Sequence, residues 1–247
     1  MSDVPTSASG PTPLSTETRA RLERVSTATL TNQLQRRGIR STFFSGLRAS
    51  HPGRKMIGHA KTLRYVPMRE DMVPVLGGLQ SAQRRAVEGI QPDEVLVIEA
   101  RGVADAATIG DIFVMRCLQR GAAGVVSDGG LRDTPAIYAI DLPVYHQSSH
   151  AATLQREHLP LDIDVPVACA GVLVMPGDVI VGDGEGAVCI PRALVDEVAR
   201  DADVQEDEEA FAIERVAAGE STIGLFPLSA ARRPEYEAWR AAHEQQG

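Results

Sequence analysis

The segment TIGDIFVMRCLQRGAAGVVSDGGLRD, residues 108–133, decides the expected fold. Its apolar residues first follow helical spacing and then form a short continuous run, with a glycine between the two. We therefore predict a helix over Thr108–Arg120 and a buried strand over Ala123–Ser127. The β-branched run EVLVIEA at Glu94–Ala100 predicts another strand before them. Strand, helix and strand in this order indicate a right-handed crossover between two parallel strands, which is typical of an α/β fold.

Charged side chains stand at one end of this unit. Asp111 lies near the start of the predicted helix, and Arg132 and Asp133 follow the predicted strand on a loop. Carboxylate oxygens suit Mg²⁺, Mn²⁺ or Ca²⁺, and a guanidinium fork binds a carboxylate or an enolate oxygen. The backbone amides near Ile112 and Phe113, free at a helix N-terminus, are expected to bind a carboxylate. The segment thus predicts a metal site beside a small anionic substrate.

Each of these residues also has a plain structural explanation. Asp111 alone could simply interact with the helix dipole, and Asp133, before Thr-Pro, could simply cap the next helix. Gly129 and Gly130, placed on the same loop, are expected to let a substrate approach the backbone closely. The combination of these residues favours a functional site more strongly than any one of them.

Composition limits the class of protein. The net charge is −8 and no basic face is visible, which argues against a nucleic-acid binder. Three scattered cysteines without CxxC spacing argue for buried free thiols rather than for a zinc site or disulfides. No apolar run approaches the roughly 18 residues of a membrane helix, and no signal peptide is visible. We predict a cytoplasmic protein that binds neither nucleic acid nor a membrane.

The rest of the chain is expected to form one domain, residues 18–247, behind a flexible N-terminal arm of residues 1–17 that is rich in Ser, Thr and Pro. Residues 161–190 alternate short β segments with Pro and Gly, which predicts hairpins or barrel strands. The remaining predicted elements are a strand at Ile57–Val66 and helices at Ser26–Arg37, Gln80–Glu88, Pro191–Ala218 and Ala230–Glu244.

Three motifs together resemble one known family. They are RGAAGVVSDGGLRD (Arg120–Asp133), STATLTNQL (Ser26–Leu34) and PGDVIVGDGEGAVCIP (Pro176–Pro191). With the spacing from Asp111 to Arg132 and Asp133, the chain is similar to the RraA-like proteins from about Val25 to Phe226. This family includes metal-dependent 4-hydroxy-4-methyl-2-oxoglutarate/4-carboxy-4-hydroxy-2-oxoadipate aldolases and the regulator of ribonuclease activity A.

The resemblance implies an α/β fold with layered α-β-β-α swivelling-domain architecture, a central sheet or barrel, and additional N- and C-terminal helices. It also implies a homotrimer or homohexamer with its active site in a cleft between protomers. In that site Asp133 binds Mg²⁺ or Mn²⁺ directly or through its waters, Asp111 orders metal-bound or catalytic water, and Arg132 contacts the 2-oxo group. Gly110, Ile112 and Phe113 match the loop whose amides hold the substrate carboxylate.

The expected function is that of a divalent-metal-dependent lyase that cleaves a C–C bond of a small 2-oxo acid. Retro-aldol cleavage gives pyruvate, and oxaloacetate decarboxylation is a shared activity because it passes through the same enolate. Two alternatives stay open: a non-catalytic regulator of an RNA-degrading enzyme, and a metal-dependent dehydratase or hydratase of a sugar-derived 2-oxo acid. Because the regulator lacks the full acid pair, the presence of Asp111 favours catalysis.

Five residues outside this set are weaker candidates. Arg156 could reach a distal substrate carboxylate, although a surface arginine is the simpler interpretation. His146 and His150 could form a base or ligand pair, but polar loop residues near strand ends are common. Glu208 or Glu209 of a neighbouring subunit could complete the site, although a plain solvated helix face is the simpler interpretation.

Overall fold

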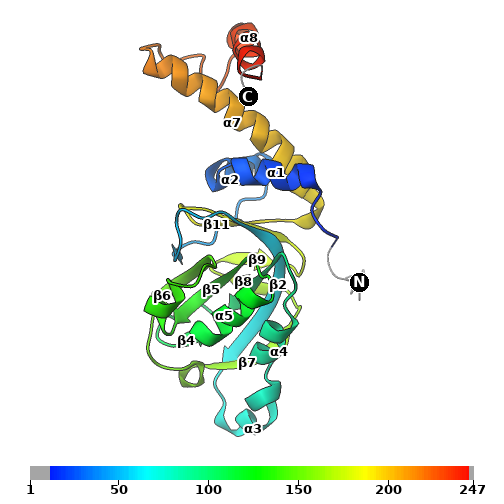
Figure 1. The fold of residues 1–247 in the computed structure, drawn as a ribbon, viewed down its shortest axis with the longest axis vertical. Helices are drawn as coiled ribbons and strands as arrows, with labels where there is room; N and C mark the ends of the chain where they lie inside the picture. Colours follow the sequence, from blue (N-terminus) through cyan, green and yellow to red (C-terminus); the bar gives the residue numbers. More distant parts are fainter. Residues whose placement is uncertain (1–11, 245–247) are drawn as a thin grey trace.

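The computed structural model describes residues 12–244, which are built around a curled nine-stranded sheet (Figure 1). The strands are β1 (Arg48–Ala49), β2 (Met56–Pro67), β3 (Glu94–Glu99), β4 (Ala107–Ile109), β5 (Gly124–Leu131), β6 (Val144–Ser149), β7 (His158–Ile163), β8 (Val167–Cys169), β9 (Val172–Val174), β10 (Val179–Gly182) and β11 (Ala187–Ile190). The order across the sheet is β1-β6-β5-β3-β2-β10-β11, with β4 on β5 and β7 on β2, while β8 and β9 pair separately. The mixed α/β class is therefore confirmed, and the α-β-β-α layering stays a prediction.

Helices surround this sheet. The α-helices are α1 (Thr16–Arg24), α2 (Thr27–Arg36), α3 (Val73–Leu76), α4 (Ala82–Gly89), α5 (Asp111–Gln119), α6 (Thr134–Ile137), α7 (Val195–Ala217) and α8 (Arg233–Glu244). Short 3₁₀ turns occur at Glu70–Met72, Gly78–Gln80, Leu154–Arg156, Arg192–Leu194 and Ala230–Arg232. Within the described residues, no helix is both long and apolar enough to cross a membrane.

Local sequence signals account for several element boundaries. The hydroxyl of Ser26 accepts a hydrogen bond from the amide of Thr29 and so caps α2. Gly38 follows this helix with φ +82°, a conformation that glycine adopts without strain. β3 and β5 are parallel neighbours, as the strand-helix-strand order predicted. The hairpins expected within residues 161–190 appear as the antiparallel pairs β8–β9 and β10–β11.

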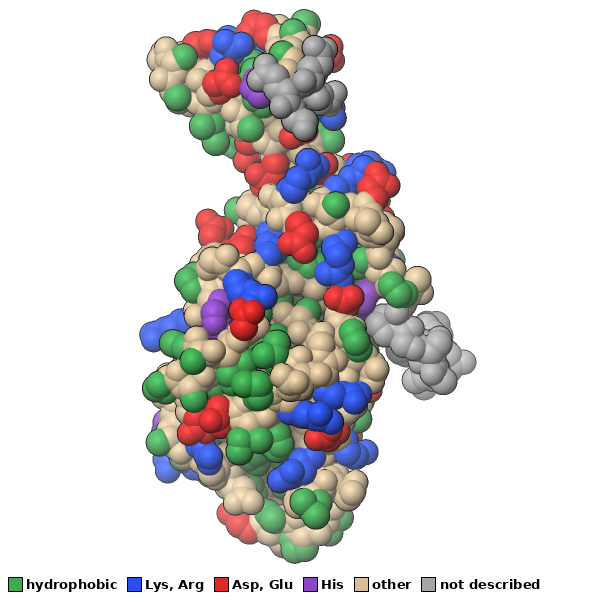
Figure 2. Space-filling model, in the orientation of Figure 1, with side chains coloured by type: hydrophobic (Ala, Val, Ile, Leu, Met, Phe, Trp, Pro, Cys, Tyr) green, Lys and Arg blue, Asp and Glu red, His purple; other side chains and the backbone are tan. Residues whose placement is uncertain are grey.

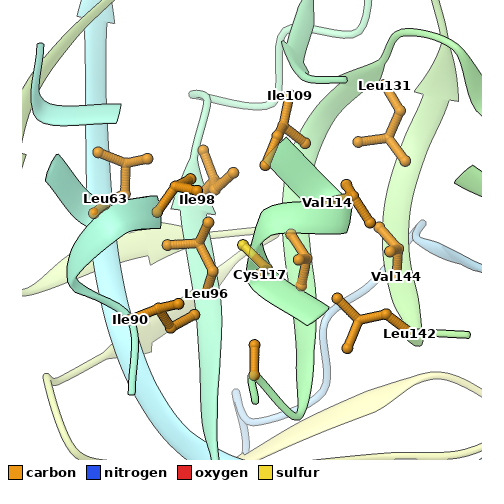
Figure 3. Close-up of a cluster of buried hydrophobic side chains, with 14 of the residues drawn as sticks. Leu63, Ile90, Leu96, Ile98, Ile109, Val114, Cys117, Leu131, Leu142 and Val144 are labelled. Carbon is orange, nitrogen blue, oxygen red and sulfur yellow. The ribbon is translucent and has the colours of Figure 1, made fainter. Parts of the chain in front are cut away.

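Aliphatic side chains fill the space on both faces of the sheet. One cluster lies between the sheet and α4, α5 and α6, and its members include Leu96, Ile98, Val114 and Cys117 (Figure 3). A second cluster covers the opposite face beneath β8 and β9, and a third packs α1, α2 and α7 against β10 and β11. The three cysteines are buried free thiols, as predicted, and burial raises the pKa of Cys117 to about 12.

Two expectations near the chain's start and middle were wrong at their boundaries. The expected arm of residues 1–17 overlaps α1, which begins at Thr16 behind the capping hydroxyl of Ser15; residues 1–11 lie outside the described part. The helix expected at Thr108 begins at Asp111, because Ala107–Ile109 pair with β5 as β4. A strand of three residues has too little alternation to be recognised against a following helix.

The C-terminal helices form a separate extension of the body. α7 leaves the sheet and meets α8 through a small aromatic cluster in which Phe211, Tyr236 and Trp239 have ring centroids 5.7–6.4 Å apart (Figure 1). On the face shown in Figure 2, acidic and basic side chains are interspersed over both the body and this extension.

Candidate functional site

A pocket of about 530 Å³ opens beside the N-terminal end of α5. Five stretches of chain contribute to it: the segment before and at the start of α4, β4 with the start of α5, the residues after β5, the turn before β7, and β7 itself. The residues that line it are Met68, Val73, Gly77, Gly78, Leu79, Ser81, Gln83, Arg84, Ala107, Thr108, Ile109, Gly110, Asp111, Ile112, Phe113, Arg132, Asp133, Thr153, Leu154, Gln155, Leu159 and Pro160. The structure thus brings the predicted metal, catalytic and substrate-binding residues into one cavity, namely Gly110, Asp111, Ile112, Phe113, Arg132 and Asp133.

Backbone pairing explains why Asp111 and the Arg132–Asp133 pair converge. The amide of Arg132 donates to the carbonyl of Ile109 at 3.1 Å, so the chain after β5 runs beside the chain after β4. A Cβ placed on Gly110 would lie 3.0 Å from Oδ2 of Asp133. The carboxylate of Asp133 therefore lies against the backbone just before α5, in space that a side chain at position 110 would occupy.

Asp133 has an unusual backbone conformation. Its φ of 62° and ψ of 33° place it in the left-handed region, immediately before α6. Non-glycine residues adopt this conformation at a cost, and Asp and Asn adopt it more readily than other residues. Such strain is often retained at functional sites. Here the turn directs the Asp133 carboxylate back towards Gly110.

Arg132 and Asp133 form an ion pair, with Nε of Arg132 3.0 Å from Oδ2 of Asp133. The side chains are 44% and 36% exposed, and ion pairs this exposed contribute at most about 1 kcal/mol to stability. Within the described residues, the terminal guanidinium nitrogens of Arg132 have no hydrogen-bond partner. They remain available to a ligand in the pocket.

The first turn of α5 offers backbone donors to the same space. Oδ1 of Asp111 accepts a hydrogen bond from the amide of Ile112 at 2.8 Å, so this amide is engaged by a neighbouring side chain. The amides of Asp111 and Phe113 have no acceptor among the residues that the structure describes. Free amides at a helix N-terminus attract anions. Of the predicted donors, the amide of Phe113 is thus free and that of Ile112 is occupied, while the amide of Asp111 is a free donor that was not predicted.

The acidic residues suit a hydrated hard cation better than a metal enclosed by protein ligands. No group of three or more His, Cys, Asp or Glu that could hold a metal occurs in the described part of the chain. Mg²⁺ commonly keeps several waters and binds through one or two carboxylates plus substrate oxygens. Asp133 with Asp111 provides that number of carboxylates, and Mn²⁺ accepts the same oxygen donors.

The floor of the pocket is fixed by a shared carbonyl. The carbonyl of Thr108 accepts one hydrogen bond from the hydroxyl of Tyr65 at 2.9 Å and another from Nε2 of Gln83 at 2.6 Å. Burial raises the pKa of Tyr65, so its hydroxyl remains a donor. These two bonds hold the start of α4 beside β4 and the start of α5.

Gly129 and Gly130 have a different role from the predicted one. They lie buried within β5, not on an exposed loop, because this strand extends to Leu131. A Cβ on Gly129 would lie 2.6 Å from Cγ2 of Thr108, and one on Gly130 would lie 2.7 Å from the carbonyl oxygen of Ala106. The glycines allow close contact between β5 and the chain that leads into α5, and they do not line the main pocket.

Replacing Gly129 with alanine is expected to lower stability by about 1–3 kcal/mol, because the added methyl group overlaps Thr108 in a packed interior. For a chain of this size that corresponds to a drop in Tm of at least about 3 °C in a thermal melt. The matched control is Gly53→Ala, since nothing lies within 4 Å of a Cβ at Gly53. Equal melting temperatures for the two variants would contradict this account of the strand.

Other polar residues of the segment serve the scaffold. The carboxylate of Asp128 accepts hydrogen bonds from the amides of Ala100, Gly102 and Ala170 at 2.5, 3.0 and 3.2 Å. Burial raises the pKa of Asp128, and these three bonds oppose the rise. Asp128 thus stabilises the turn after β3 and lies outside the pocket lining.

The structure places His146, His150 and Arg156, the weaker candidates, in three different surroundings. His146 is buried and bonds to the hydroxyl of Tyr138 and the carbonyl of Ser148, and burial lowers its pKa. His150 lines a smaller cavity of about 380 Å³ that also reaches Arg132 and Asp133. Arg156 does not line the main pocket and instead lies 3.6 Å from Oδ2 of Asp105.

Glu208 and Glu209, expected as candidates from a neighbouring subunit, lie on α7 and do not line the pocket of their own chain. Glu208 accepts a hydrogen bond from Arg233 of α8 at 2.5 Å, and Glu209 accepts one from Gln205 at 2.7 Å. Their expected role in a neighbouring site stays a prediction.

Arg84 lines the pocket but was not predicted from the sequence, because a lone arginine on a predicted helix carries no motif.

The family model described as "RraA-like: Aldolase/RraA" matches residues 27–189, more than half of the chain. The chain belongs to the RraA-like family. The matched region contains every pocket residue and ends before α7.

Individual relatives of this RraA-like protein carry both enzyme and regulator names. A protein of Halalkalibacterium halodurans named "Putative 4-hydroxy-4-methyl-2-oxoglutarate aldolase" is 34% identical over 56% of the chain and 66% of that relative. The match spans less than two thirds of the relative's length. Streptomyces coelicolor RraAS2, described as an unusual member of the RNase ES inhibitor RraA protein family, is 36% identical with a TM-score of 0.72, over 81% of this chain and 96% of that one. An uncharacterized protein from Pseudomonas syringae pv. tomato is 25% identical with a TM-score of 0.74, over 87% and 98%.

Proposed function

We propose that this protein is a divalent-metal-dependent lyase that cleaves a C–C bond of a 2-oxo acid and releases pyruvate. The observation that carries the proposal is the convergence of Asp111, Arg132, Asp133 and the N-terminal end of α5 on one pocket. The aldolase name of a relative that is 34% identical supports the same class of reaction. Oxaloacetate decarboxylation is proposed as a second activity, because it yields the same pyruvate enolate.

Asp133 would hold Mg²⁺ or Mn²⁺, with Asp111 binding one of its waters. The bound cation would supply Lewis-acid stabilisation of negative charge on substrate oxygens. Asp133 is suited to this position because its turn conformation fixes the carboxylate beside Gly110. The ion pair with Arg132 holds that carboxylate in place and leaves its second oxygen, Oδ1, for the cation.

The chain's own groups would bind and orient the substrate. The free amide of Phe113 and the positive end of α5 would hold the 1-carboxylate. The terminal nitrogens of Arg132 would donate hydrogen bonds to the 2-oxo oxygen, where charge accumulates when the C3–C4 bond breaks. Water hydrogen-bonded to Asp111 would take the proton from the C4 hydroxyl and return a proton to C3, so that cleavage releases pyruvate and a second carbonyl compound.

A Schiff-base route has little support in this sequence. The chain has two lysines, Lys55 and Lys61, and neither lines the pocket. Nζ of Lys61 pairs with Asp164 at 3.2 Å, and that of Lys55 bonds to the carbonyl of Val25. Stabilisation by a cation and an arginine provides an electron sink without a lysine.

The test is an oxaloacetate assay with coupled detection of pyruvate. We expect the protein with Mg²⁺ or Mn²⁺ to release pyruvate well above the same metal without protein, and EDTA to return the rate to background. Excess Mn²⁺ should restore the activity. A panel of 4-hydroxy-2-oxo acids then identifies the aldol substrate. If no 2-oxo acid is turned over above the protein-free control, the lyase proposal fails.

A non-catalytic regulator is the second candidate, since RraAS2, which is 36% identical, belongs to an RNase inhibitor family. Acidic residues are concentrated in α7 between Asp201 and Glu209, and a face of this kind would mimic nucleic acid in a regulator of an RNA-degrading enzyme. In the structure, however, Asp203 pairs with Arg24, Asp201 with Arg37, and Glu208 with Arg233. These carboxylates attach neighbouring helices to α7, which leaves less negative charge for a partner. Inhibition of an RNase E-type enzyme without lyase activity would favour the regulator.

Oligomeric assembly is also a proposal. Glu208 and Glu209 lie on α7 and do not line the pocket of their own chain. In a homotrimer or homohexamer, one of them would approach the pocket of a neighbouring protomer. Light scattering after size-exclusion chromatography measures the number of protomers.

A further inference from the structure

The pocket contains a second arginine that the proposed chemistry does not use. Arg84 lies in the first turn of α4 and lines the same cavity as Arg132. Its guanidinium carbon lies 5.4 Å from the centroid of the Phe113 ring. The two pocket arginines thus belong to different walls, one at the end of β5 and one on α4.

Neighbouring contacts hold Arg84 at this wall. The adjacent Gln83 is buried and donates to the carbonyl of Thr108 at 2.6 Å, which fixes the first turn of α4 over β4. Phe113 packs against the main hydrophobic cluster and presents its ring to the guanidinium. A cation over an aromatic face is attracted to it, yet its N–H groups at the edge stay free to bind an anion.

The two arginines differ in their partners. Arg132 pairs with Asp133 at 3.0 Å. The guanidinium of Arg84, in contrast, makes no hydrogen bond and no ion pair with any residue in the described part of the chain. A planar guanidinium in a pocket whose N–H groups have no bound acceptor can bind a carboxylate through two parallel hydrogen bonds.

The charges of the pocket also leave room for a second anionic group. Its charged lining residues are Arg84, Arg132, Asp111 and Asp133, whose formal charges sum to zero. A bound divalent cation, which belongs to the proposed function, makes the total +2. A 2-oxo acid with one carboxylate neutralises half of this charge, and a dicarboxylate neutralises all of it.

We infer that Arg84 is a specificity-determining residue, which binds a second carboxylate of the substrate and selects dicarboxylic over monocarboxylic 2-oxo acids. This inference rests on the proposed function, because it takes the first carboxylate to lie at α5. A single planar guanidinium matches a carboxylate, whereas phosphate sites usually combine several backbone and side-chain donors.

Ligand binding tests the inference without turnover. 2-Oxoglutarate and 2-oxopentanoate have the same five-carbon chain, but only the first carries a terminal carboxylate, and neither has the 4-hydroxyl needed for cleavage. Calorimetric titration of the full chain in Mg²⁺ should show 2-oxoglutarate binding about 10-fold tighter, which is what one charge-assisted hydrogen-bonded pair contributes.

Arg84→Met keeps an unbranched side chain beside Phe113 and removes the charge. We expect it to weaken 2-oxoglutarate about 10-fold and to leave 2-oxopentanoate within about 2-fold. Arg85→Met is the matched control: Arg85 is also exposed on α4 and does not line the pocket, so this variant should keep the preference. Thermal melts should show that both variants are folded.

Other outcomes would contradict either the role of Arg84 or the proposed function, and the two cases can be told apart. If the wild type binds both ligands equally, or if Arg84→Met weakens both to the same extent, the role of Arg84 is wrong while the 2-oxo acid pocket stands. If the wild type binds neither ligand, the proposed function fails as well. If a 2-oxo acid of the same chain length with a terminal phosphate binds more tightly than 2-oxoglutarate, Arg84 selects a phosphate and the assignment of a carboxylate is wrong.

Discussion

Changing Asp133 to asparagine is expected to lower metal-dependent kcat/KM by about 1,000-fold, because the cation loses the carboxylate proposed to hold it. Asparagine is the sharper substitution than alanine. Position 133 has φ 62°, which asparagine adopts at lower cost than alanine, so the turn before α6 should survive. Steady-state assays with Mn²⁺ give the loss of turnover, and titration of Mn²⁺ followed by electron paramagnetic resonance should show affinity weakened by at least about 10-fold.

The chain provides a matched control for this variant in Asp164. That residue also has a left-handed backbone, with φ 55°, is partly exposed, and pairs with a cation, Lys61, at 3.2 Å. Asp164→Asn therefore repeats the loss of charge at a left-handed position away from the pocket, and its activity and Mn²⁺ affinity should stay within about 2-fold of wild type. Full metal-dependent turnover in Asp133→Asn would remove Asp133 from the site.

The central part of the fold was predictable because its signals are local. The β-branched run that became β3 and the helical spacing that became α5 gave the right order, and the parallel pairing of β3 with β5 followed. Cap residues such as Ser26 also act within a few residues of their position. β4 could not be recognised, since a strand of three residues becomes visible only through its pairing with β5.

The grouping of Asp111 with Arg132 and Asp133 was predictable for a similar reason, because the start of the helix and the end of the strand after it lie at the same end of a strand-helix-strand unit. The same reasoning failed for Gly129, which was expected on a loop and lies within β5. Its burial depends on the side chain of Thr108, which lies 21 residues earlier and which no local pattern connects to it. The opposite wall of the pocket, including Arg84, comes from a segment whose apolar and small residues carry no sign of chemistry.

Replacing Arg132 with alanine is expected to reduce kcat/KM by about 100- to 1,000-fold while Tm changes by no more than about 2 °C. The loss in rate follows because Arg132 is proposed to stabilise charge that develops on the 2-oxo oxygen, an effect of this order when one such donor is removed. Stability should hold because the side chain is 44% exposed and its ion pair with Asp133 contributes at most about 1 kcal/mol. A paired measurement of kinetics and thermal melting separates the two effects.

Arg116→Ala serves as the matched control for this last variant. Arg116 is 43% exposed, pairs with Glu88 at 2.6 Å, and lies on α5 outside the pocket lining, so it repeats the loss of a surface ion pair without the loss of a pocket donor. Arg132→Lys completes the set, because lysine keeps the charge but not the planar fork. If the fork orients the 2-oxo oxygen, lysine should restore substrate affinity more than kcat; equal recovery of both would mean that Arg132 supplies only charge, and no loss in Arg132→Ala would exclude it from the reaction.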